Sequence, residues 1–278
     1  MLCKVSTEFV NNKIQKNIMK SKKHWTDPEY GFFGSFYQKG DKSKNGCSGK
    51  TQEERTKEEV EGVIRLLGLK RGYEFSILDC PCGIGRHSIE LAMMGQMVTA
   101  VDSNLEQLSV GVKNACSQMR IDSPTFRLGN MLYLESIHRF DAVINMFFSF
   151  GFFKTDEENR KVAQNFFNLL RPGGKFLMHT DVNMARIRNG TYKFKEGRLL
   201  VNGETLKIIE HYDSHTKRIN GAWIIAKEHK EYSVRVYENE EFVNLCKEVG
   251  FKDVKIYSDW SGSPYSEEAE MVIFVAEK

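Results

Sequence analysis

The sequence predicts an α/β fold with a mostly parallel sheet and an antiparallel β insertion after the fifth strand. Between residues 58 and 180, short apolar segments alternate with segments of helical periodicity, and such alternation indicates right-handed crossovers between parallel strands. From about residue 192 to residue 237, long β-rich segments joined by turn signals replace this alternation. A chain of 278 residues with 41% hydrophobic positions can bury one large core.

The α/β part begins with a helix whose four apolar residues between 60 and 67 share one face. Thr155 and Glu158 have the spacing of a capping box at the start of a later helix, and Pro172-Gly-Gly terminates that helix. The alternation predicts strands at 76–79, 96–102, 125–128, 140–145 and 175–179, and helices at 58–67, 87–94, 106–119 and 155–170.

The insertion is expected at about residues 190–237, where Asn202-Gly203, Ser214-His-Thr and Asn220-Gly221 mark turns between antiparallel strands. A helix at 240–249 with Gly250 as its C-cap follows. Two final strands are expected at 252–257 and 270–276. We therefore expect residues 51–278 to form one domain with an inserted sheet, and residues 1–50 to form an N-terminal arm and aromatic lid.

The charge and hydropathy of the chain argue against nucleic-acid and membrane partners. A formal net charge of +3 at pH 7 is too small to indicate a nucleic-acid partner. A lysine cluster near the start predicts a solvated arm; it comprises Lys13, Lys16, Lys20, Lys22 and Lys23. No run of about 18 apolar residues and no signal-peptide core occur, so we expect a cytoplasmic protein.

The six cysteines are scattered, as is usual in a reducing compartment. Cys80 and Cys82 lie close together, but no second pair completes a structural zinc site, and one proline alone separates them, which is not redox spacing. We expect no metal, and we interpret these thiols as small buried groups.

The segment 79–85, Asp-Cys-Pro-Cys-Gly-Ile-Gly, follows the first strand, where open α/β sheets bind their ligands. Gly83 and Gly85 let the backbone approach a ligand closely. The third glycine of a dinucleotide fingerprint is missing. A carboxylate at Asp79 suits a ligand with an ammonium group better than a pyrophosphate, which it would repel. Asp102 ends the second strand, where ribose hydroxyls are bound.

Several segments, taken in order, resemble the motifs of class I S-adenosylmethionine-dependent methyltransferases. They are the loop 79–85, Asp102, Gly129-Asn-Met, Asn145-Met-Phe-Phe and Leu170-Arg-Pro-Gly-Gly. The resemblance spans roughly residues 50–180. It implies a Rossmann-like seven-stranded sheet, S-adenosylmethionine as cofactor and S-adenosylhomocysteine as product.

The resemblance also implies how the cofactor is held. The first loop would hold its methionine moiety, and Asn130, where aspartate is commoner, would meet the adenine amino group. Tyr37 and Arg55 are candidates for binding the cofactor carboxylate, by hydroxyl and by charge. The expected cofactor site comprises Tyr37, Arg55, Asp79, Cys80, Gly83, Gly85, Asp102, Ser103, Asn130, Met131 and Asn145.

Aromatic residues are dense near the start of the chain and just after the fourth strand. The first group is interleaved with glycines, which favours a lid that folds over the cofactor and provides apolar walls for a flat acceptor. We expect the acceptor to contact Trp25, Phe33, Phe147 and Phe150.

Charged residues beside the predicted pocket are candidates for amine binding or proton acceptance. Asp156 and Arg160 begin the helix after the aromatic loop, four residues apart, and form either a pair at the pocket rim or an ordinary first-turn salt bridge. His179 and Asp181 end the fifth strand and fit a catalytic or a structural role equally. Methyl transfer is an in-line displacement, so no metal is required.

Residues 145–148 lack the two prolines of the Asn/Asp-Pro-Pro-aromatic turn found in enzymes that methylate nucleobase amines. Residues 146–153 and the insertion resemble N-methyltransferases of amino sugars and peptide-derived natural products, above all the plantazolicin methyltransferases, which dimethylate the N-terminal amine of an azole-containing peptide. This resemblance implies a small-molecule or short modified-peptide acceptor. The alternatives are C- or O-methylation of a small aromatic metabolite, RNA methylation based on the lysine cluster, and a non-catalytic cofactor-binding module.

Overall fold

A computed structural model describes residues 23–41, 50–70, 75–118, 124–135, 138–200 and 202–278. Of the predicted lysine cluster, only Lys23 lies within these ranges, so the expectation of a solvated arm over residues 1–22 falls outside the described residues.

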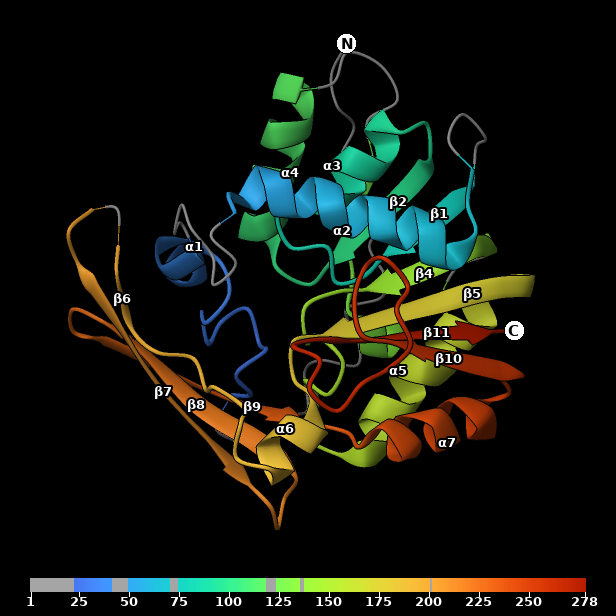
Figure 1. Ribbon diagram of the computed structural model, residues 1–278. Coiled ribbons are helices and arrows are strands. Elements are labelled where there is room, and N and C mark those ends of the chain that lie inside the picture. The colour runs from blue at the N-terminus through green and yellow to red at the C-terminus, as the bar shows by residue number, and fades with distance from the viewer. Residues whose placement is uncertain (1–22, 42–49, 71–74, 119–123, 136–137, 201) are drawn as a thin grey trace.

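A seven-stranded sheet forms the centre of the molecule, with strand order β10-β11-β5-β4-β1-β2-β3 (Figure 1). Strands β1 to β5 run parallel, and β11 pairs antiparallel with both β5 and β10. The predicted α/β class with a mostly parallel sheet is confirmed. The strands are β1 (Ser76–Asp79), β2 (Met97–Asp102), β3 (Thr125–Leu128), β4 (Phe140–Asn145), β5 (Leu170–Thr180), β10 (Asp253–Tyr257) and β11 (Val272–Glu277).

Helices cover both faces of this sheet, as Figure 1 shows. One face carries α2 (Gln52–Leu67), α3 (Arg86–Met93) and α4 (Leu105–Gln118), and the other carries α5 (Asp156–Leu169) and α7 (Asn239–Val249). Each face has its own apolar core: Val60, Val63 and Leu67 of α2 pack on β1 and β4, while Phe166 of α5 and Phe242 of α7 pack on β5. The sheet is therefore buried on both sides, as parallel sheets usually are.

The caps that the sequence predicts are present. The Thr155 hydroxyl accepts a hydrogen bond from the Glu158 amide, and the Glu158 carboxylate accepts one from the Thr155 amide, which completes the capping box of α5. Gly250 ends α7 with a left-handed φ of 114°. Strand β5 is longer than expected because Leu170 already pairs with Phe140, before a register shift that brings Ala142 opposite Lys175.

A second sheet of strand order β6-β7-β8-β9 follows β5, as predicted. It comprises β6 (Arg198–Leu199), β7 (Thr205–Asp213), β8 (Arg218–Ile225) and β9 (Glu228–Arg235), all paired antiparallel. The prediction of a turn at Asn220-Gly221 is wrong, because both residues lie inside β8, and the chain turns instead after Ile225. Gly221 is needed there because a Cβ atom would lie 2.4 Å from Cζ of Tyr232.

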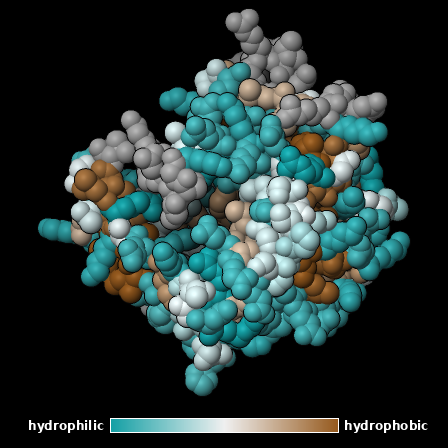
Figure 2. Space-filling view, in the orientation of Figure 1, coloured by the Kyte–Doolittle hydropathy of each residue, from teal (hydrophilic) through white to brown (hydrophobic). Residues whose placement is uncertain are grey.

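The N-terminal segment packs against this inserted sheet. Trp25, Phe32 and Phe36 share an apolar core with Leu206, Trp223 and Val234 of the sheet. Helix α1 (Ser35–Asp41) lies between the inserted sheet and the α/β domain, and the short α6 (Met184–Arg188) precedes the sheet (Figure 1). Figure 2 shows a mostly hydrophilic face, with hydrophobic side chains in patches at the left over the inserted sheet and at the right over the α/β domain. Among the described residues, no helix combines the length and apolarity needed to cross a membrane.

Candidate active site

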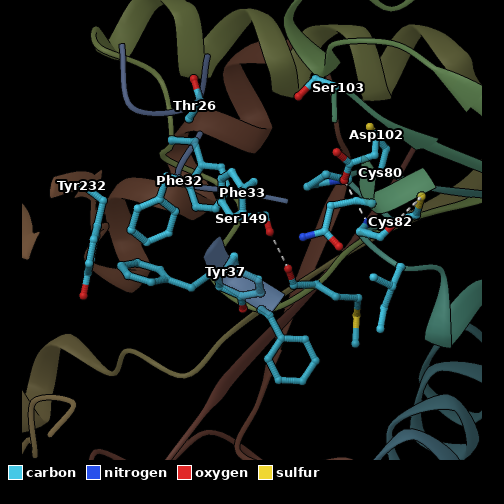
Figure 3. Close-up of a pocket in the computed structure, with 18 of the residues that line it drawn as sticks. Thr26, Phe32, Phe33, Tyr37, Cys80, Cys82, Asp102, Ser103, Ser149 and Tyr232 are labelled. Carbon is cyan, nitrogen blue, oxygen red and sulfur yellow. Dashed lines mark hydrogen bonds between the residues drawn. The ribbon is translucent and has the colours of Figure 1, made fainter. Parts of the chain in front are cut away.

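A cavity of about 370 Å³ lies between the carboxyl edge of the seven-stranded sheet and the inserted sheet. The loops that follow β1 to β4 all contribute to its wall, which is where open α/β sheets bind ligands. Asp102, Ser103, Cys80 and Cys82 lie at one end, Phe32 and Tyr232 lie at the other, and Ser149 lies between the two ends (Figure 3). We call these the strand end and the aromatic end of the cavity.

The loop after β1 leaves open space at the strand end. Gly83 has a φ of +55°, and a Cβ atom there would meet nothing within 4 Å. Gly85 serves a different purpose: its Cβ would lie 2.6 Å from the Phe126 ring, so its missing side chain allows helix α3 to pack closely, and it does not line the cavity. Cys80 and Cys82 are free and buried, and burial raises the pKa of both thiols.

Asp79 lies beneath this loop and is fully buried. Its Oδ2 accepts a hydrogen bond of 2.5 Å from the Ser88 hydroxyl, while its Oδ1 has no partner. Burial raises the pKa of this carboxyl to about 7. Because Asp79 does not line the cavity, its contact with a ligand ammonium stays a prediction.

Asp102 lines the cavity at the end of β2. Its two carboxylate oxygens accept hydrogen bonds of 2.8 Å from the backbone amides of Gly83 and Asn104. Burial raises the pKa of Asp102, although these amides oppose the shift. The carboxylate therefore joins the loop after β1 to the end of β2, and Ser103 continues the wall beside it.

The two predicted asparagines differ in position. Asn130 lines the cavity with Met131, and its Oδ1 accepts a hydrogen bond of 2.9 Å from the Leu132 amide. Asn145 is fully buried away from the cavity wall, and its Nδ2 donates to the Cys80 carbonyl at 2.8 Å. Asn145 thus fixes the loop after β1 from below, and its contact with the cofactor stays a prediction.

Arg55 and Tyr37 both line the cavity. Arg55 lies in the first turn of α2, and its Nε is buried without a hydrogen-bond partner, which leaves a charged donor available to an anionic group. The Tyr37 ring stacks on Trp223 of the inserted sheet, with ring centroids 5.1 Å apart and an interplanar angle of 10°. Tyr37 therefore connects the N-terminal segment to the aromatic end.

A tight turn after β4 lies between the two ends. Phe147 and Phe148 have φ values of 56° and 59°, which are uncommon for residues with side chains. His179 holds this turn from below, because its Nδ1 accepts from the Phe147 amide at 3.3 Å and its carbonyl accepts from the Phe148 amide at 3.0 Å. Strain of this kind is typical of functional sites.

The aromatic end is built from distant parts of the chain. Trp25, Phe33 and Phe152 contact one another, with ring centroids 4.7 to 5.7 Å apart. Trp223 and Tyr232 of the inserted sheet complete the wall. Such walls suit an apolar or flat ligand.

A model of the methyltransferase domain matches residues 77–174, which include the loops after β1 to β4. The protein is an S-adenosylmethionine-dependent methyltransferase. The cavity of this methyltransferase fits that cofactor, since it offers open space at Gly83, a guanidinium nitrogen without a hydrogen-bond partner at Arg55 and a carboxylate at Asp102.

The methyltransferase has relatives among enzymes and solved structures. It is 27% identical over 220 residues to glycine/sarcosine N-methyltransferase of Aphanothece halophytica, across 78% of this chain and 82% of that protein. The CcbJ methyltransferase from Streptomyces caelestis has a TM-score of 0.73 and 18% identity, with 89% of this chain and 96% of that chain covered. S-adenosylmethionine-bound CalS10, an amino pentose methyltransferase from Micromonospora echinaspora, has a TM-score of 0.56 and 20% identity, with 83% and 92% covered.

Besides Asp79, Gly85 and Asn145, several residues predicted to contact or activate the acceptor do not line the cavity of the methyltransferase. Phe150 packs in the core against Phe242, at a centroid distance of 5.2 Å, because the chain has turned inward after Phe148. Asp156 does not pair with Arg160: it forms an ion pair of 3.1 Å with Arg235, while Arg160 lies 4.0 Å from Glu248. His179 is buried under the turn.

Asp181 also lies outside the cavity wall, but it is close to it. Its Oδ2 is 3.4 Å from Nζ of Lys195, and Lys195 lines the cavity. Neither His179 nor Asp181, the two candidates for proton acceptance or amine binding at the end of β5, lines the cavity. Among the described residues, no group of His, Cys, Asp or Glu side chains is arranged to hold a metal ion.

A buried polar network supports the wall beside the turn. Arg86 and His87 line the cavity and both bind Glu59 of α2, with His87 Nε2 at 3.0 Å from Glu59 Oε2. Burial opposes ionisation of Glu59, but hydrogen bonding from His87 and the Arg86 charge outweigh it and lower its pKa to about 2. Burial and the Arg86 charge lower the pKa of His87 to about 4. The guanidinium of Arg86 lies 4.5 Å from the centre of the Phe147 ring.

Sequence reasoning missed the polar residues that the insertion, including the segment before its first strand, contributes to the aromatic end. These are Lys195, Glu210 and Tyr232. An antiparallel sheet was predicted for the region of Glu210 and Tyr232, and the strand register, which pairs both with Gly221, places them on one face. No local motif marks that face as the one that closes the cavity.

Proposed function

We propose that this methyltransferase is an N-methyltransferase that acts on an amine of a small natural product. The observation that carries the proposal is one continuous cavity. The loops after β1 to β4, where open α/β sheets bind a cofactor, line one end of it, and aromatic side chains line the other end. The first curated relative named above methylates nitrogen, and CalS10 is named for an amino sugar.

The choice of nitrogen rests on what the cavity wall contains. A phenol or carbon acceptor must lose a proton to a positioned base before it attacks. His179 and Asp181 do not line the cavity, and the His87 Nε2 is engaged with Glu59. The two carboxylates of the wall, Asp102 and Glu210, already accept hydrogen bonds from the protein on both of their oxygens. An amine needs less assistance, because its neutral form already has a nucleophilic lone pair.

The cofactor, when bound, supplies an electrophilic methyl group on a sulfonium. The residues of the chain have to align the acceptor with that group and exclude water. Arg55, Asp102 and Asn130 would hold the cofactor, and the Phe147–Phe148 turn would set the point at which the acceptor meets it. The amine lone pair forms the new N–C bond as the C–S bond breaks, and the positive charge passes from sulfur to nitrogen.

The finer proposal is an acceptor whose amine is carried on a flat apolar body. The N-terminal amine of an azole-containing peptide, such as desmethylplantazolicin, has this chemistry, and amino sugars share only the amine. Support for such a body comes from Trp25, Phe33, Phe152 and Trp223 in the wall.

Calorimetry with S-adenosylhomocysteine, followed by incubation with labelled donor and a panel of amines, desmethylplantazolicin, phenols and RNA, tests the proposal. We expect saturable binding and label on amines. Label on a phenol or on RNA, and not on an amine, would contradict the proposal and identify that compound class as the acceptor. Binding without transfer to any acceptor would favour a non-catalytic module.

A further inference from the structure

Glu210 is a fixed carboxylate at the aromatic end of the cavity. Its Oε1 accepts a hydrogen bond from the Tyr232 hydroxyl, and its Oε2 accepts one of 2.7 Å from the Lys195 backbone amide. Tyr232 reaches it by crossing over Gly221, the residue that pairs with both in the sheet. The position of the carboxylate is thus set by the sheet itself.

The charge of Glu210 is not cancelled by an ion pair. Among the ion pairs of the described residues, Lys195 binds Asp181 at 3.4 Å, and no basic side chain is within 4.0 Å of Glu210. The other carboxylate in the cavity wall, Asp102, lies at the opposite end from Tyr232 (Figure 3). Lys195, Asp181 and Glu210 together carry one net negative charge, and the ion pair of the first two leaves Glu210 as its source.

We propose that Glu210 binds the ammonium group of the acceptor, so that the enzyme selects amines that arrive as cations on an apolar or aromatic body; the ammonium then releases one proton to water before its lone pair attacks the methyl group. This inference rests on the proposed function and adds the residue that recognises the substrate. The aromatic walls favour the same ligand, because the faces of Trp and Tyr rings attract cations. A carboxylate and an ammonium form a charge-assisted hydrogen bond, which is stronger than a neutral one.

Two probes of the same shape test this, namely benzylamine and benzyl alcohol, titrated into protein saturated with S-adenosylhomocysteine. We expect wild type to prefer the cationic benzylamine, and Glu210→Gln to reduce benzylamine affinity about tenfold or more, with benzyl alcohol unchanged. The matched control is Glu231→Gln, next to Tyr232 but on the other face of β9, and it should behave as wild type. The proposal is overturned if wild type shows no preference for benzylamine, or if Glu210→Gln keeps it.

A second measurement separates this inference from the proposed function. Unchanged affinity of Glu210→Gln for S-adenosylhomocysteine would establish that the variant is folded. One outcome is that wild type and Glu210→Gln both methylate amines with the same KM for the amine. In that case the enzyme is an N-methyltransferase, but Glu210 does not bind the ammonium group. If wild type methylates no amine but the benzylamine preference depends on Glu210, the amine site stands and the proposed reaction fails.

Discussion

Asp102 combines a structural and a binding position in one side chain. Its carboxylate fixes the backbone of Gly83 and Asn104 and also faces the cavity. Loss of the carboxylate therefore removes hydrogen bonds that order the loop and those expected to the ribose.

Asp102→Ala should weaken S-adenosylhomocysteine binding by about 1–3 kcal/mol, measured by calorimetry, because charge-assisted hydrogen bonds are lost. Asp102→Asn keeps one acceptor oxygen and should lose less. Unchanged affinity in Asp102→Ala would contradict the assignment of this residue to the ribose.

Arg55 allows a more specific test, since its buried Nε has no partner. Arg55→Met should reduce the affinity for S-adenosylhomocysteine about tenfold or more, because it removes the half-buried cation expected to bind the amino-acid carboxylate. The affinity for 5′-methylthioadenosine, which lacks that carboxylate, should not change. The control is Lys57→Met, which removes an exposed cation of the same helix. If Arg55→Met lost the same affinity for both ligands, Arg55 would not bind the carboxylate.

At this scale, the sequence predicted which strand ends meet at the cavity better than which side chains face it. Asp79 and Asn145 also end parallel strands, but they are buried away from the cavity wall. Asp102 and Asn130 follow parallel strands, whose carboxyl ends must meet at one edge. Asp156 and Arg160 have helical spacing, yet Arg235 and Glu248 compete for them from other elements. Glu210 could not be predicted because its function depends on which face of the inserted sheet closes the cavity.

Among the elements, β8 is the strand on which the aromatic end depends. Gly221 in its middle lets the Tyr232 ring lie across the strand and reach Glu210. Asn-Gly is a typical hairpin signal, so the sequence predicted a turn here, whereas the requirement for glycine comes from a neighbouring strand.

Gly221→Ala should lower the free energy of unfolding by about 1–3 kcal/mol, because the added Cβ overlaps the Tyr232 ring. Denaturant unfolding of the single variants and the double variant would measure this. In a Tyr232→Ala background the same substitution should cost little, which gives a coupling energy between the two sites. Additive effects would show that the ring contact is not the reason for this glycine.

In the molecule as a whole, stability should depend on pH through groups buried in their neutral form. Burial lowers the pKa of His179 to about 4, so the folded state binds fewer protons than the unfolded state between about pH 4 and its ordinary value near 6.5. The stability that the neutral imidazole provides is present above about pH 6.5 and is lost as the pH falls through about 4. Asp79, with its pKa raised to about 7, has the opposite effect.

His179→Asn isolates one of these contributions, since the amide oxygen can accept from the Phe147 amide but does not titrate in this range. The difference in unfolding free energy between wild type and this variant should fall by about 3 kcal/mol between about pH 7.5 and pH 4. The contribution of Asp79 cancels in that difference. Parallel stability curves for the two proteins would show that His179 is not a buried neutral group.

The apolar core shared by Trp25, Phe32 and Phe36 with Leu206 and Trp223 joins two stretches of chain that are far apart in sequence. Neither stretch belongs to the matched domain at residues 77–174. A chimera designed to take the acceptor preference of another enzyme would consequently have to exchange both stretches together. The loops after β1 to β4, which are expected to bind the methyl donor, could stay unchanged.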